Sequence, residues 1–199
     1  MSFDFDTGNE GSQGPWIQWS AQKEKFLLRD INGKSDFKGF ETGVVLDIRT
    51  MKTGWSRSDG VVGVAPEWRW NPTLNAYQPK PGEDWKKGFS IRCAASKTDA
   101  ASWEQAGTGA WNAFVALVPA IQAGPSDHDK LPLVRMIGVK TERFARGSTT
   151  TPTLEIVKWV DRPDCLKDGA AAGIAVEEKT EQPVATAAPS PMPADSSEF

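Results

Sequence analysis

Basic and aromatic side chains alternate with aliphatic ones in the segment 43–58, where the period-two pattern of a strand separates two faces. One face holds Val44, Leu46 and Ile48. The other face holds Arg49, Thr53, Trp55 and Arg57. Indole rings offer stacking surface to bases, and guanidinium groups bind phosphates. The second face therefore predicts contact with a single nucleic-acid strand rather than a hydrophobic core.

A second aromatic pair follows in the string EWRW, where Trp68 and Trp70 are two residues apart and project from the same side of a strand. Tyr77 lies in a loop stiffened by prolines, which is typical of binding loops. The adjacent pair Lys86 and Lys87 is either a phosphate contact or a solvated strand edge. The candidate nucleic-acid-binding residues are Arg49, Lys52, Trp55, Arg57, Trp68, Trp70, Tyr77, Lys86 and Lys87. The competing interpretation is that these tryptophans anchor a core, as most tryptophans do.

The charge of the chain is unevenly distributed, although its net value is only −3. Residues 1–10 carry three of the 26 acids, and residues 169–199 carry five acids with one of the 23 bases. Removing both ends leaves 18 acids and 22 bases, so the body 11–168 has a net charge of +4. A body of this charge, flanked by acidic ends, suits a polyanionic ligand.

The sequence offers no catalytic, metal or cofactor constellation. Two distant cysteines, Cys93 and Cys165, and the single His128 do not form a zinc-binding pattern, and Cys93 is expected in the core. Nucleotide-hydrolysis and common hydrolase motifs are absent. A nuclease would require convergent carboxylates, and the spacing of the available ones predicts no convergence. These carboxylates are Asp47, Asp59, Glu67, Glu83 and Asp84. We expect a protein that is not an enzyme.

The expected elements form a mainly β domain over residues 15–168. Residues 16–30 suggest a lead-in hairpin, and strands are expected at 43–57, 67–70 and 85–93. A helix kinked by Pro119 follows at 108–124, and a β-hairpin spans 131–160. Three strands, a helix and two strands match an OB-fold-like five-stranded antiparallel barrel with its helix between the third and fourth strands; a sandwich is the rival.

Both ends of the chain differ from this body in composition. Residues 1–14 are polar and glycine-rich, which predicts a flexible N-terminus. Residues 169–199 contain Ala, Pro, Ser and Glu with almost no large apolar residue, which predicts a disordered acidic tail. The tail ends in DSSEF, and its candidate partner-binding residues are Asp195, Glu198 and Phe199.

This combination resembles the single-stranded DNA-binding proteins of tailed phages, which join an OB core to an acidic tail ending in an aromatic residue. The features that carry the resemblance are the basic-aromatic strand 49–57, the EWRW pair, the hairpin 131–160 and the terminus DSSEF. The resemblance implies binding of single-stranded DNA during phage replication, recombination and repair, with the tail recruiting replication or recombination proteins. The tail carries few acids and the body many tryptophans for that family.

Other functions fit parts of the same pattern. Planar tryptophans also stack on sugars, so a carbohydrate-binding module is the alternative, and a protein-interaction β-barrel is another. The N-terminus lacks a basic region followed by an apolar run, so we expect a cytoplasmic protein, in the bacterial host if phage-encoded, and no membrane contact. The sequence leaves open a homo-oligomer and the choice between DNA and RNA.

Overall fold

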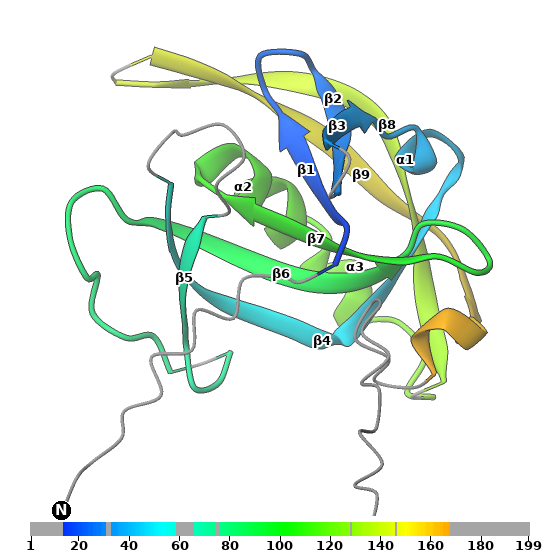
Figure 1. The fold of residues 1–199 in the computed structure, drawn as a ribbon. Coiled ribbons are helices and arrows are strands. Elements are labelled where there is room, and N and C mark those ends of the chain that lie inside the picture. Colours follow the sequence, from blue (N-terminus) through cyan, green and yellow to red (C-terminus); the bar gives the residue numbers. More distant parts are fainter. Residues whose placement is uncertain are drawn as a thin grey trace, which may run out of the picture.

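A curled, open sheet of nine strands forms the body of the protein in a computed structural model that describes residues 14–30, 33–58, 66–74, 76–127, 129–145 and 147–167 (Figure 1). The strand order is β3-β2-β1-β7-β6-β4-β8-β9, and β5 pairs with β4. The strands are β1 (Trp16–Ser20), β2 (Lys25–Asp30), β3 (Gly33–Asp36), β4 (Val44–Arg57), β5 (Glu67–Trp70), β6 (Lys86–Ala94), β7 (Ala100–Ala106), β8 (Lys130–Phe144) and β9 (Gly147–Asp161). The helices are α1 (Gly39–Thr42), α2 (Thr108–Val115), α3 (Val118–Gln122) and the 3-10 turn η1 (Asp164–Leu166).

The hydrophobic core fills the inside of the curl and is centred on Trp103 of β7. This indole is fully buried and meets the rings of Phe26, Phe40 and Phe89 edge-on, with centroid distances of 5.8, 5.3 and 4.9 Å. Helix α2 packs against β6 and β7 on one side and β9 on the other, and contributes Phe114. The helix therefore lies within the curl and joins the two arms of the sheet (Figure 1).

A bulge in β4 changes which face of the sheet its side chains occupy. Asp47 pairs with Arg92 of β6, whereas Lys52 pairs with Ser90. Five steps along β4 therefore correspond to two steps along β6. Because the difference is odd, the alternation of β4 relative to β6 reverses across the bulge.

The reversal corrects the face predicted for Trp55. Leu46 pairs with Cys93 and Thr53 pairs with Phe89, and both β6 partners are buried in the core. Trp55, two residues after Thr53, therefore continues the same face as Leu46 rather than the opposite one. The prediction that Trp55 lies on the face opposite Leu46 is therefore wrong. The sequence pattern runs on without a break and gives no sign of the bulge that reverses the faces.

The expectation of five strands is also wrong, because the described residues contain nine. β7 was not predicted, since Ala, Ser, Glu and Gln are weak strand formers and hide the central position of Trp103. The predicted lead-in hairpin is confirmed, and β1 enters the same sheet by pairing in parallel with β7. The mainly β class is confirmed, as a half-barrel that is open rather than a closed five-stranded barrel.

The most strongly patterned elements agree with the sequence prediction. Strands β8 and β9 form the expected long antiparallel hairpin. The expected helix divides into α2 and α3, with Pro119 in the first turn of α3. None of the helices in the described ranges has the length and apolar character needed to span a bilayer.

Candidate nucleic-acid interface

Three strands meet at one end of the sheet and place the candidate residues on two opposite faces. In this part of the sheet Trp55 of β4 is directly opposite Arg69 of β5 and Lys87 of β6. Cross-strand partners share a face, so these three side chains lie together on the face that continues from the core. We call this face the inner patch, defined by Trp55, Arg57, Arg69, Tyr77, Trp85 and Lys87.

Positive groups lie over aromatic rings throughout the inner patch. The Lys87 ammonium is 5.9 Å from the Trp55 ring centroid and 5.0 Å from that of Tyr77. The guanidinium carbons of Arg57 and Arg69 are 5.5 and 5.1 Å from the Trp85 ring. These distances are within the range of cation–π attraction. The patch therefore places positive charge next to flat surfaces.

The opposite face carries a second group, the outer pair of Trp68 and Trp70. Their rings are stacked, with centroids 4.4 Å apart and planes 9° from parallel, as their shared side of β5 predicts. Gly88 lies beneath the pair, and a Cβ there would approach the Trp68 ring to 2.8 Å. Lys52 lies 6.0 Å from the Trp70 ring, and Lys86 follows the same face of β6. The outer pair is thus also bordered by cations.

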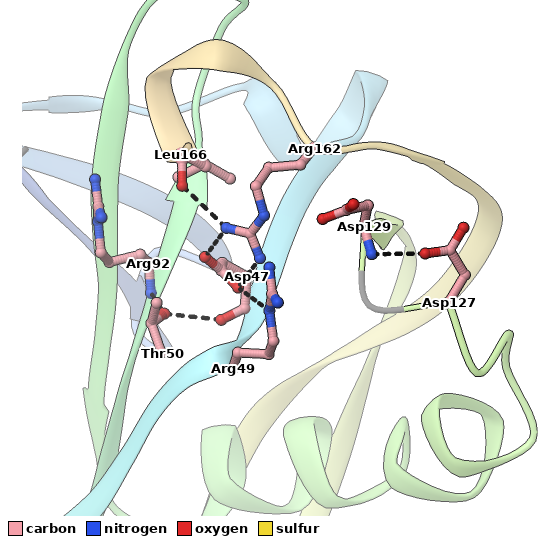
Figure 2. Close-up of polar contacts among 8 residues, drawn as sticks. All are labelled: Asp47, Arg49, Thr50, Arg92, Asp127, Asp129, Arg162 and Leu166. Atoms are coloured by element: carbon pink, nitrogen blue, oxygen red, sulfur yellow. Dashed lines mark hydrogen bonds and ion pairs between the residues drawn. The ribbon is translucent and has the colours of Figure 1, made fainter. Parts of the chain in front are cut away.

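Arg49 is separate from both groups and belongs to a polar cluster at the β4 bulge (Figure 2). Its Nε is 4.0 Å from the Asp47 carboxylate, which is only 2% exposed. Arg162 donates to both oxygens of that carboxylate, at 2.9 Å for Nη2, and to the Leu166 carbonyl at 2.9 Å. The hydrogen bond that Arg162 donates to Asp47 raises the pKa of Arg162 above its usual value. This cluster fastens the end of β9 and η1 to the bulge.

The exposure of the rings determines which of them a ligand can reach. Trp55, Trp68 and Trp85 are 9%, 7% and 6% exposed, and the Trp55 Nε1 donates to the Gln78 carbonyl at 2.9 Å. Tyr77 is 42% exposed, and Trp70 is half-buried. Tyr77 and Trp70 are therefore the accessible stacking surfaces, one on each face. The three buried indoles serve mainly as rigid supports for the cations and loops around them.

Arg69 and Trp85 belong to the inner patch although neither was among the candidate residues. Both carry the side-chain types that the prediction used, but Arg69 alternates away from the tryptophans of EWRW. Only the pairing of β5 with β4 brings it next to Trp55. A search for every cation within two residues of a tryptophan would have identified Arg69.

Several carboxylates of the described residues form ion pairs, among them Asp47 and Glu67. Arg57 Nη2 donates to Glu67 at 2.8 Å, and Arg69 Nε is 4.0 Å from the same carboxylate. No three metal-ligating side chains gather within the ranges that the structure describes. The Cys93 thiol donates to the Ala101 carbonyl, and burial raises its pKa to about 12, which keeps it protonated as a core residue.

Several predicted features lie outside the described residues. They are the flexible N-terminus 1–13, Asp59, His128, and the tail with Asp195, Glu198 and Phe199.

Comparison with known proteins does not identify a relative, because no family model, curated protein or solved structure matches this chain.

Proposed function

We propose that this chain is a non-enzymatic single-stranded DNA-binding protein that uses one end of its curled sheet in the manner of an OB fold. The observation that supports it best is the layering of cations and rings on both faces of that end. Among the described residues, five cation–aromatic contacts involve β4, β5, β6 and the loop between β5 and β6. A single strand presents bases for the rings and phosphates for the cations.

This arrangement favours binding with little sequence preference. Stacking on an aromatic side chain contributes about 1–3 kcal/mol per base and tolerates every base, because each has a π face. Lysine and arginine contacts displace counterions, so affinity should fall as salt rises. The body's excess of 22 bases over 18 acids in residues 11–168 strengthens both attraction and salt sensitivity.

The resemblance to phage single-stranded DNA-binding proteins extends the proposal to replication, recombination and repair. In that role the acidic segment 169–199, which ends in Phe199, recruits a replication or recombination protein. The Phe199 ring next to acids suits a partner surface with a basic rim and a hydrophobic pocket. The cellular site that accompanies this role is the bacterial cytoplasm.

The proposal is tested by titrating the full chain with fluorescein-labelled oligo-dT, the matching duplex and oligo-U at several salt concentrations. We expect oligo-dT to bind, to quench tryptophan emission, and to bind more weakly as salt rises. Binding that is indifferent to salt, or absent, would contradict the proposal. Affinity electrophoresis in soluble glucan and chitin oligomers provides the opposing arm, because retardation there without an oligonucleotide shift favours the carbohydrate module.

A further inference from the structure

A pocket of about 600 Å³ opens beside the inner patch, between elements that are far apart in the sequence. Its walls come from the end of β1, the start of β6, the β7–α2 connection and the start of β9. The side chains that matter for ligand binding are Trp19, Lys87, Gln105, Trp111 and Thr149. The volume falls in the range of about 300–1,000 Å³ that is usual for small-molecule sites.

The pocket is held in shape by internal hydrogen bonds rather than formed by loose loops. Trp19 Nε1 donates to the Thr150 carbonyl at 3.0 Å, and the Trp19 amide donates to Gln105 Oε1 at 2.6 Å. Thr150 Oγ1 in turn donates to the Ala21 carbonyl at 2.6 Å. These bonds join β1, β7 and β9 across 86 and 131 residues of sequence. A ligand would therefore meet a preorganised wall.

Positive charge and the start of a helix meet at the rim of the pocket. Lys87 is exposed and lines the pocket, whereas Lys86 borders it but alternates to the outer face of β6. The first turn of α2 begins at Thr108, carries no acidic residue and has no side-chain cap. Together these groups favour an anionic ligand.

The pocket and the inner patch are continuous because they share Lys87. The Lys87 ammonium is close to the rings of Trp55 and Tyr77, and the same side chain lines the pocket. Gln105 and Lys87 lie on the inner face of their strands, as does Phe89, which is 6.2 Å from the half-buried Trp111 ring. A strand crossing the inner patch can therefore enter the pocket without passing around a sheet edge.

We propose that this pocket holds one nucleotide of the bound single strand, with its base against Trp111 and its phosphate beside Lys87 and the first turn of α2. This inference rests on the proposed function and adds to it a defined end point for the strand. A pocket nucleotide fixes the register and direction of the strand, whereas stacking on Tyr77 alone fixes neither.

The first test compares Thr108→Asp with Thr108→Asn in the full chain. Thr108 is exposed, and an acid in the first turn of a helix favours its dipole, so both variants should fold. The aspartate repels a phosphate in the pocket, whereas the asparagine has nearly the same shape without the charge. We expect oligo-dT binding about fivefold weaker for Asp than for Asn at low salt, converging as salt rises. Equal affinities at low salt would overturn the inference.

The second test fills the pocket with Thr149→Phe and uses Thr153→Phe as the matched control. Both residues are half-buried on β9, but only Thr149 lines the pocket. We expect Thr149→Phe to weaken oligo-dT binding about five- to tenfold, as for the loss of one stacked base, with Thr153→Phe unchanged. Unfolding of Thr149→Phe in a circular-dichroism melt would leave the Thr108 pair as the deciding comparison.

Fluorine NMR of fluorotryptophan-labelled protein separates this inference from the proposed function. The Trp111 resonance, assigned with Trp111→Phe, should shift when oligo-dT is added, and this shift should disappear in Thr149→Phe. Salt-sensitive oligo-dT binding that shifts Trp70 but leaves Trp111 unchanged would refute the pocket and keep the proposed function. Absence of oligo-dT binding to the unmodified chain would refute both.

Discussion

The core around Trp103 and the end of the sheet at β5 use the same kinds of aromatic side chain with different partners. Around Trp103 the rings contact other rings, as with Phe89 at 4.9 Å and an angle of 85°. On the inner patch the rings contact cations, as with the Trp85 ring, which is 5.5 Å from the guanidinium carbon of Arg57 and 5.1 Å from that of Arg69. Edge-on ring contacts within a dry core favour stability, whereas cations over rings at the surface hold a charged binding surface in place. The partners of a tryptophan, rather than its burial alone, therefore distinguish the two regions.

The largest expected effect tests the core around Trp103. Trp103→Ala should lower the free energy of unfolding by about 3–5 kcal/mol, because it removes a fully buried indole at the centre of the aromatic cluster. Trp70→Ala, on the half-buried outer pair, should cost under about 1.5 kcal/mol and reduce oligo-dT affinity instead. Urea denaturation followed by circular dichroism measures both. A larger stability loss for Trp70→Ala than for Trp103→Ala would erase the distinction between the regions.

The next effect concerns the bulge of β4, which lies between Asp47 and Lys52. Asp47→Ala should destabilise the fold by about 3 kcal/mol or more, because Arg162 would keep a largely buried charge without its partner. The matched control is Glu155→Ala, which breaks an exposed ion pair with Arg135 and should cost at most about 1 kcal/mol. Thermal and urea melts of both variants provide the measurement. Similar losses in the two would show that the Asp47–Arg162 pair does not hold the bulge.

A smaller effect tests the inner patch through Lys87. Lys87→Ala should weaken oligo-dT binding by about 1–3 kcal/mol, because Lys87 faces two rings and lines the adjacent pocket. The slope of log affinity against log salt should decrease in magnitude by about 0.7, as for one lost contact with a single strand. Lys25→Ala, on the distant strand β2, removes the same charge and should change neither quantity appreciably. Equal responses of the two variants would indicate that net charge alone attracts the strand.

The smallest effect concerns Glu142 of β8, which joins α2 to the β8–β9 hairpin. Its carboxylate contacts Lys140 at 2.9 Å and accepts from Asn112 at 2.9 Å, and these contacts lower its pKa. The stabilisation is complete above the unfolded pKa of about 4.3 and is lost as the pH falls through the lower folded pKa. Glu142→Gln should therefore cost well under about 1 kcal/mol at neutral pH. The difference in melting temperature between the unmodified chain and Glu142→Gln should vanish in acid. A difference that does not change with pH would contradict the stabilising role of the Glu142 carboxylate.

The agreement between sequence and structure depends on the range of the interactions. The hairpin β8–β9, the helix interrupted before Pro119 and the shared side of Trp68 and Trp70 follow from local alternation and backbone restrictions. Of the candidate site residues, Trp55, Arg57, Tyr77 and Lys87 gather on the inner patch. Lys52, Trp68, Trp70 and Lys86 gather on the other face, while Arg49 lies apart.

The amino-acid sequence by itself determined the mainly β class, the long hairpin and the supply of cations next to rings, because each depends on neighbours within a few residues. Only the tertiary structure decided the face of Trp55, since a bulge reverses the alternation within an unbroken strand. It also decided the site of Asp47, whose partner Arg162 is 115 residues away. The pocket arises in the same way, because pairing across the sheet brings Trp19 to Gln105 and Thr150, and no local pattern encodes which distant strands will pair.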